Sequence, residues 1–212
     1  MVIDETHRLN GAHWCPSPHC GPPAGQAGGA EAGQFVWQPE LIIIHCISLP
    51  SGEFGTGLPS QLFTGRLDCE SHPSLADLAG LRVAPHLFVD RNGQVEQFVP
   101  FNLSAWHAGV SSWGGRRSCN HFSLGIELEG TWHQPFTDAQ YQALIPICAA
   151  LCRRYPSLSP SAIVGHQEVA PGRKEDPGPY FDWPRLLAAL HSLMFASAPQ
   201  VENAKAHQGG NA

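Results

Sequence analysis

The chain has 212 residues and a mass of 22.9 kDa, enough for one well-buried core and short for two domains. Hydrophobic residues make up 42% of the chain, a globular proportion, and the formal net charge is -6. Because its 12 lysines and arginines are scattered, the sequence offers no basic stripe for a phosphate backbone, and nucleic-acid binding is disfavoured.

The start of the chain bears on its location. Residues 1–10 lack the basic start and apolar run of a secretory signal. The longest strongly apolar stretch, 41–44, falls far short of the roughly 20 residues of a membrane helix. We therefore expect a cytoplasmic monomer with no membrane partner. Its seven cysteines, an odd number without metal-type spacing, are expected to be free thiols.

Two segments of biased composition frame the chain. Residues 24–34 are mostly Gly and Ala and predict a loop, whereas the polar, Gly-rich residues 196–212 predict a disordered tail. No repeat or linker divides the remainder. We expect an N-terminal segment over 1–34, one domain over 35–195 and the tail.

Four stretches predict strands. Residues 41–45 form a continuous apolar run, typical of a strand buried on both faces. An Asn-Gly turn joins residues 87–89 to 95–99 as a hairpin. Residues 123–129 alternate between an apolar face and a face that carries Glu127 and Glu129. A short strand is expected at 163–164.

Helix signals follow in the second half of the chain. Thr137 and Gln140 form a capping box at the start of a helix, which Pro146 should kink or shift at its start. Asp182 is suited to cap a last helix that runs to about residue 193. Strands and helices mixed in this way predict an α/β fold, with one central mixed sheet flanked by helices.

Three candidate metal ligands lie at or just beyond strand ends. His45 and His166 each follow a buried strand, and Asp176 comes ten residues after His166 in a loop rich in Pro and Gly. Two imidazoles and a carboxylate leave a fourth position for water, the pattern of a catalytic zinc. With twelve histidines in the chain, spacing alone does not select these three residues.

Several ordered motifs resemble the AmpD type of N-acetylmuramoyl-L-alanine amidase. The similarity starts near Pro16 and runs to about Leu190, most of the chain. The motifs that carry it are IIHCISLP at 43–50, GEFG at 52–55, AWHAGV at 105–110, FSLGIELEG at 122–130, GH at 165–166 and RKEDPGP at 173–179. This resemblance implies the amidase and peptidoglycan-recognition-protein fold.

The resemblance also implies the chemistry. It makes His45, His166 and Asp176 the ligands of Zn²⁺. Periodicity leaves Glu127 and Glu129 equivalent; the family match selects Glu127 as the acid/base group. It implies that Lys174 stabilises the negative charge that develops on the oxygen of the amide carbonyl. The implied substrate is a small muropeptide, cut between the lactyl group of 1,6-anhydro-N-acetylmuramic acid and L-alanine during cell-wall recycling.

Groove residues follow from the same motifs. Trp106 and His107 match a stretch that lines the substrate groove, and Arg82 matches an arginine suited to clamp a peptide carboxylate. Cys46 stands where relatives commonly have Asn, and Ser118 stands where a basic residue is expected. We expect Cys46, as a substrate-binding residue, to make a weaker hydrogen bond than Asn would, and Ser118 to change part of the carboxylate recognition.

Three alternatives stay open at this stage. A peptidoglycan-binding module shares the fold but often lacks zinc. A cysteine hydrolase would use Cys46 with His45, although adjacent strand residues point to opposite faces. An amidase of the same family acting on intact wall outside the membrane would need export, against which the missing signal argues.

Overall fold

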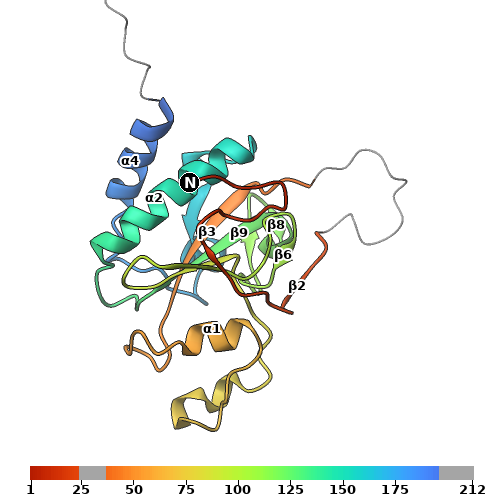
Figure 1. The fold of residues 1–212 in the computed structure, drawn as a ribbon, viewed down its shortest axis with the longest axis vertical. Coiled ribbons are helices and arrows are strands. Elements are labelled where there is room, and N and C mark those ends of the chain that lie inside the picture. The colour runs from red at the N-terminus through yellow and green to blue at the C-terminus, as the bar shows by residue number, and fades with distance from the viewer. Residues whose placement is uncertain (24–36, 196–212) are drawn as a thin grey trace, which may run out of the picture.

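A computed structural model describes residues 1–23 and 37–195. Six strands form one mixed sheet in the order β1-β5-β4-β9-β3-β10. Figure 1 shows its neighbouring strands β3 and β9 side by side. Within this sheet, the β4–β5 pairing is antiparallel and the other four pairings are parallel. The strands are β1 (His13–Trp14), β3 (Leu41–Ile47), β4 (Leu87–Val89), β5 (Val95–Gln97), β9 (Ser123–Glu129) and β10 (Ile163–Gly165). The predicted α/β fold with a central mixed sheet is confirmed.

Two small ribbons and short helices complete the elements. The ribbons pair β2 (Cys20–Gly21) with β6 (Ser104–Ala105), and β7 (Ser112–Trp113) with β8 (Arg116–Arg117). The 3₁₀ helices are η1 (Pro73–Leu78), η2 (Cys119–His121) and η3 (Pro160–Ala162), and the α-helices are α1 (Leu58–Phe63), α2 (Asp138–Arg154), α3 (His166–Val169) and α4 (Trp183–Phe195).

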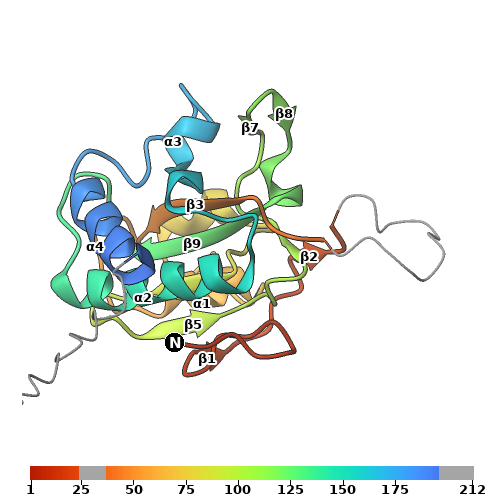
Figure 2. The same cartoon turned by 90° about the horizontal axis from the view of Figure 1, so that it is seen from above.

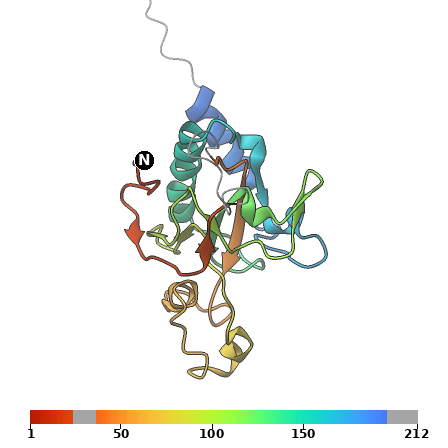
Figure 3. The same ribbon diagram turned by 90° about the vertical axis from the view of Figure 1, so that its right-hand side faces the viewer.

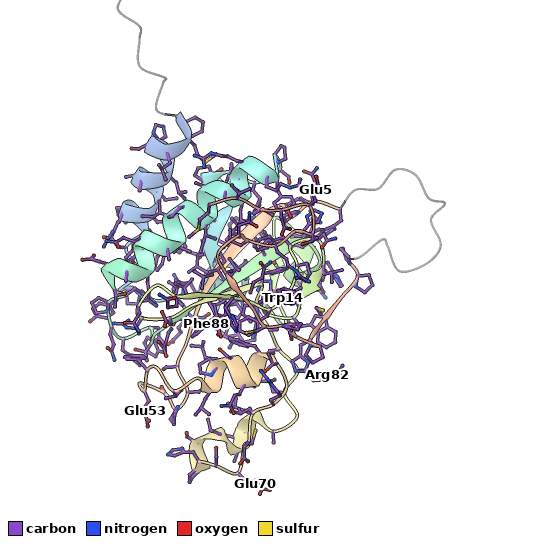
Figure 4. All side chains as sticks on the ribbon, viewed as in Figure 1. Glu5, Trp14, Glu53, Glu70, Arg82 and Phe88 are labelled. Carbon is purple, nitrogen blue, oxygen red and sulfur yellow. The ribbon has the colours of Figure 1, made fainter. Side chains whose placement is uncertain are left out.

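Helices cover the sheet on both faces. Helices α2 and α4 pack on one face, and α1 lies on the other, as Figures 1 and 3 show. On the α2 side, the apolar face predicted for 123–129 is confirmed, since Leu124, Ile126 and Leu128 are fully buried in the main core. On the α1 side, Phe88, labelled in Figure 4, packs edge-on against Phe63.

The N-terminal segment joins the main sheet. Its strand β1 pairs in parallel with β5, and Figure 2 shows the two side by side at one edge of the molecule. Strand β2 then pairs with β6. The predicted loop at 24–34 and tail at 196–212 lie outside the described residues. All seven cysteines carry free thiols, as expected.

The helix predictions are mostly confirmed. The capping box forms: Gln140 N donates to Thr137 Oγ1 over 3.1 Å, and Thr137 N donates to Gln140 Oε1 over 3.0 Å. Asp182 caps α4 by accepting from Arg185 N at 3.0 Å. Of the two outcomes expected for Pro146, a kink or a shifted helix start, the shifted start is wrong, because α2 begins at the capping box and continues through Pro146.

Tertiary packing explains why α2 tolerates this proline. Leu144 and Ile147 on either side of Pro146 are fully buried against the sheet. Proline removes the bond that the carbonyl of Gln142 would accept, and Gln142 lies at the exposed surface. None of the helices within residues 1–23 and 37–195 is both long and apolar enough to cross a membrane.

One buried side chain ties α2 to the sheet. The Gln140 amide nitrogen donates to the carbonyl of Val89 at 3.2 Å and of Glu129 at 2.9 Å, at the ends of β4 and β9. Gln140 has no exposed surface. Its side chain therefore joins the first turn of α2 to backbone carbonyls of two neighbouring strands.

We predict that Gln140→Ala lowers the free energy of unfolding by about 2–4 kcal/mol, because two buried carbonyls each lose a hydrogen-bond donor. Urea denaturation monitored by circular dichroism measures the change. The control is Gln142→Ala on the exposed side of the same helix, expected to stay within about 0.5 kcal/mol. Equal stability of the two variants would contradict the prediction.

Candidate metal centre

His45 and Glu127 lie side by side on neighbouring strands. Strands β3 and β9 pair in parallel, and His45 is the register partner of Glu127. Partnered residues in adjacent strands project to the same face of a sheet, here the face opposite α2. Cys46, the next residue, belongs to the other face and packs partly against the main core. Sheet pairing alone thus brings together two residues that are 82 positions apart in the chain.

His166 and Asp176 approach from the other side of β3. Strand β10 pairs in parallel with β3, with Gly165 opposite Ile44, so His166 follows at the level of His45. His166 opens α3, and the loop after α3 returns to it, since Gln167 N donates to the Asp176 carbonyl at 3.0 Å. This return places the Asp176 carboxylate beside both imidazoles.

The three side chains converge on one point. Nδ1 of His45 lies 2.9 Å from Nδ1 of His166, and Asp176 Oδ2 lies 3.2 Å and 3.0 Å from these two atoms. Around a tetrahedral ion with bonds of about 2.0–2.1 Å, ligand atoms are roughly 3.3 Å apart. Two imidazole lone pairs and a carboxylate in this arrangement therefore fit a divalent metal ion.

The protonation states suit a metal. Burial lowers the pKa of His45 to about 4, so its imidazole is neutral near pH 7. Burial alone would raise the pKa of the Asp176 carboxyl, but its position beside the His166 and His45 imidazoles outweighs burial and holds that pKa below its usual range. Neutral imidazole and ionised carboxylate are the forms that bind metals.

The second nitrogen of each imidazole is already engaged. His45 Nε2 lies 2.9 Å from His107 Nδ1, and His166 Nε2 lies 3.1 Å from the Ala108 carbonyl. Because a carbonyl only accepts, a proton on His166 Nε2 would satisfy this contact and leave Nδ1 free for a metal ion, while the Arg173 guanidinium lies 3.3 Å from the same Nε2. Such outer contacts fix ligand orientation and strengthen metal binding.

His107 connects His45 to the backbone through a series of hydrogen bonds. Its Nε2 lies 3.3 Å from Ser123 Oγ, whose hydroxyl donates to the Cys119 carbonyl at 2.6 Å. With His45 donating from Nε2, each member of the series donates to the next. His107, predicted as a groove residue, thus also positions the candidate metal ligand His45. His107 in addition lines the cavity over the site.

Two further residues that the sequence did not single out for the site hold His107 in place. A Cβ atom on Gly125 would lie 2.4 Å from the His107 ring, so only glycine admits the ring there. His86 is buried beneath; its Nδ1 accepts from Gly125 N at 3.0 Å, and its Nε2 donates to the Leu103 carbonyl at 3.0 Å. His86 therefore has a structural role. A glycine inside an alternating strand was the available signal for a close approach.

Glu127 has the environment of a catalytic carboxyl. Burial, and then the nearby Asp176 carboxylate, raise the pKa of Glu127 well above its usual value, while Lys174 opposes them. Within residues 1–23 and 37–195, nothing hydrogen-bonds its Oε2 atom. A half-buried carboxyl with a buried, unpartnered oxygen beside a candidate metal centre is typical of a group that exchanges protons.

Glu129 has a different environment. Its carboxylate accepts from the backbone N–H of Gly55 at 2.5 Å and of Arg91 at 3.1 Å. Both oxygens are thus committed to loop backbone. The structure distinguishes two residues that the strand period left equivalent.

A cavity of about 300 Å³ opens over the centre. Its polar wall includes Glu127, Lys174 and Asp176, and its apolar wall comes from α1, η1 and the segment before β4. The lining residues are Cys46, Ile47, Leu49, Leu62, Phe63, Leu78, Leu81, Val83, Ala84, Pro85, His107, Glu127, His166, Lys174 and Asp176. A small ligand with an apolar body can therefore reach the metal ligands and both charged groups.

The remaining groove candidates are less closely associated. Arg82, exposed at the periphery in Figure 4, stacks over Trp106 with 5.0 Å between its Cζ and the ring centroid. Neither residue lines the metal cavity. Burial, and then Glu127, raise the pKa of the Cys46 thiol far above its usual range, which disfavours a thiolate nucleophile. Substrate contacts of these residues remain predictions.

Comparison with known proteins is consistent with this geometry. Residues 37–179 match a family model described as N-acetylmuramoyl-L-alanine amidase. The 1,6-anhydro-N-acetylmuramyl-L-alanine amidase AmpD of Citrobacter freundii is 51% identical over 152 residues, covering 72% of this chain and 81% of that protein. A crystal structure of a selenomethionine AmpD derivative matches with a TM-score of 0.82 at 45% identity, covering 90% of this chain and 99% of the other.

A further solved structure includes a ligand. It is the complex of the amidase AmiD from Escherichia coli with the substrate anhydro-N-acetylmuramic acid-L-Ala-D-gamma-Glu-L-Lys. It matches with a TM-score of 0.53 at 31% identity, covering 81% of this chain and 65% of that one.

We predict that Gly125→Ala weakens metal binding by about 10–100-fold, because the added methyl displaces His107 from His45. Competition with a chromophoric chelator measures the affinity, and circular dichroism checks that the variant folds. Gly21→Ala is the matched control, since its Cβ meets nothing closer than 3.9 Å. A folded Gly125→Ala protein with unchanged metal affinity would refute the positioning role of His107.

Proposed function

The chain belongs to the N-acetylmuramoyl-L-alanine amidase family, and from this membership we propose a zinc-dependent hydrolysis of anhydromuropeptides. The bond cut joins the lactyl group of 1,6-anhydro-N-acetylmuramic acid to L-alanine. The observation that carries the proposal is the convergence of His45, His166 and Asp176 beneath a cavity that Glu127 and Lys174 also line.

The donor set supports zinc in particular. Two histidine nitrogens and one carboxylate oxygen form a three-ligand set that leaves a fourth tetrahedral position open. When bound, zinc polarises the amide carbonyl and lowers the pKa of a water toward ~7. A binding module of the same fold often lacks a ligand; here all three converge, which favours the enzyme.

Glu127 is suited to move the protons. We assign it the proton of the attacking water, which it then delivers to the amide nitrogen as the C–N bond breaks. The raised pKa of its buried carboxyl favours this return of the proton. The products are the lactyl carboxylate of the sugar and the free amino group of L-alanine.

Lys174 is suited to stabilise charge. It lines the same cavity as Glu127 and lies two residues from Asp176. Its ammonium group can face the carbonyl oxygen, where negative charge grows as water adds. The cytoplasmic location and the monomeric state remain predictions from the sequence.

We predict that Glu127→Gln lowers kcat by about 10²–10⁴-fold and leaves the zinc content unchanged, since the proton acceptor is lost and the ligands are not. Release of L-alanine peptide followed by chromatography, with zinc measured by atomic absorption, checks both. Glu129→Gln serves as control: it should cost about 1–3 kcal/mol of stability but keep kcat. The reverse pattern in the two variants would overturn the assignment.

The substrate prediction is tested by direct comparison. We expect kcat/KM to be higher for soluble anhydromuropeptide than for intact sacculi, because the apolar wall from α1 and η1 borders the cavity and favours a small ligand. Soluble muropeptide carrying a reduced, non-anhydro sugar serves as the matched control substrate. A preference for sacculi would instead identify an enzyme of intact wall.

A further inference from the structure

Three metal-binding side chains of different chemistry converge at β1 and β5. A ring nitrogen of His13, Sγ of Cys15 and a carboxylate oxygen of Glu96 all lie within 4.8 Å of one another. Neither the family motifs nor the proposed chemistry uses any of them. Their strands lie at the opposite edge of the sheet from β10 and His166, in the order β1-β5-β4-β9-β3-β10.

Backbone pairing, and not loop flexibility, brings the three together. His13 on β1 is the parallel register partner of Glu96 on β5, so both side chains share one face. Cys15, two residues after His13, returns to that face, and its N–H continues the ladder by donating to the Gln97 carbonyl at 2.9 Å. Ligands mounted on paired strands are held more precisely than ligands on loops.

In the absence of a metal ion, a thiol proton links two of the three side chains. The Cys15 thiol donates to Glu96 Oε1 over 3.6 Å, so a proton lies where a cation would bridge sulfur and oxygen. The other carboxylate oxygen accepts from the Ser60 hydroxyl. That hydroxyl orients the carboxylate in the way outer contacts orient metal ligands.

The surroundings leave room for further ligands. A cavity of about 330 Å³ adjoins the cluster, and His13, Glu96, Ser60 and Asp90 are among its walls. His13 is exposed and Cys15 half-buried, so an ion has a path from solvent. Water from this cavity can supply the fourth position of a tetrahedron.

We propose that His13, Cys15 and Glu96 bind a second metal ion of the zinc class. Imidazole, thiolate and carboxylate together suit borderline divalent ions such as Zn²⁺ or Co²⁺, whereas Mg²⁺ and Ca²⁺ take oxygen ligands. The ion links the edge strand β1 to β5 and thereby stabilises this edge of the sheet. The site is structural and independent of the amidase chemistry.

Cobalt tests the proposal, because sulfur ligation has a distinct signature. Untagged, metal-free full-length protein titrated with Co²⁺ should develop a sulfur-to-cobalt charge-transfer band in the near ultraviolet. The centre of His45, His166 and Asp176 contributes no sulfur. The band should disappear in Cys15→Ser and persist in the controls Cys20→Ala and Cys46→Ala, two other half-buried thiols.

The wild type lacking this band, or Cys15→Ser retaining it, would overturn the proposal. His13→Ala provides a second test at an exposed position where folding is not at risk. We expect zinc stoichiometry to fall from two to one per chain and the affinity of the second site to drop by about 100-fold or more, since outer contacts alone are worth 10–100-fold.

In His13→Ala, kcat should be unchanged, because the second site takes no part in the amidase chemistry. A failure of the second-site proposal can therefore be distinguished from a failure of the amidase proposal. Binding of one zinc per chain by the wild type, or binding of a second only at roughly millimolar metal, would also exclude the site.

Discussion

The parallel pairing of β3 with β9 is the constraint on which the rest of the structure depends. It sets His45 opposite Glu127, so a candidate metal ligand and a candidate proton carrier lie at one level of the sheet. A slip of one residue would turn one of them into the core and present its apolar neighbour to the cavity. The register is fixed from the far side, where Ile44 and Ile126 are buried against α2. Packing on one face thus decides chemistry on the other.

At the candidate metal centre, buried polar groups are stabilised by hydrogen-bond partners. Each ligand imidazole has its second nitrogen engaged, by His107 for His45 and by the Ala108 carbonyl for His166. Glu127 is the exception, since its Oε2 has no partner among the described residues. An unsatisfied buried carboxyl costs stability, and such costs concentrate where function requires them.

The two edges of the sheet serve different purposes. Strand β10, at one edge, leads directly into His166 and the loop that returns with Asp176. Strand β1, at the other, brings the first residues of the chain against β5 and carries His13 and Cys15 with it. At both edges, a short strand takes its register from the neighbouring strand. The N-terminal segment is therefore part of the sheet and not an appendage.

The sequence by itself determined the features that depend on near neighbours along the chain. The strand at 123–129, the capping box of Thr137 with Gln140 and the cap at Asp182 each follow from periods or spacings of a few residues. Tertiary structure decided the features that depend on distant pairing. Periodicity left Glu127 and Glu129 equivalent, and spacing did not select His45 with His166, because those candidate ligands lie 121 positions apart. The positioning of His45 by His107, the passage of α2 through Pro146 and the meeting of Cys15 with Glu96 arise from sheet register and core packing. Such contacts carry no local period, since the residues that make them meet only when the sheet forms.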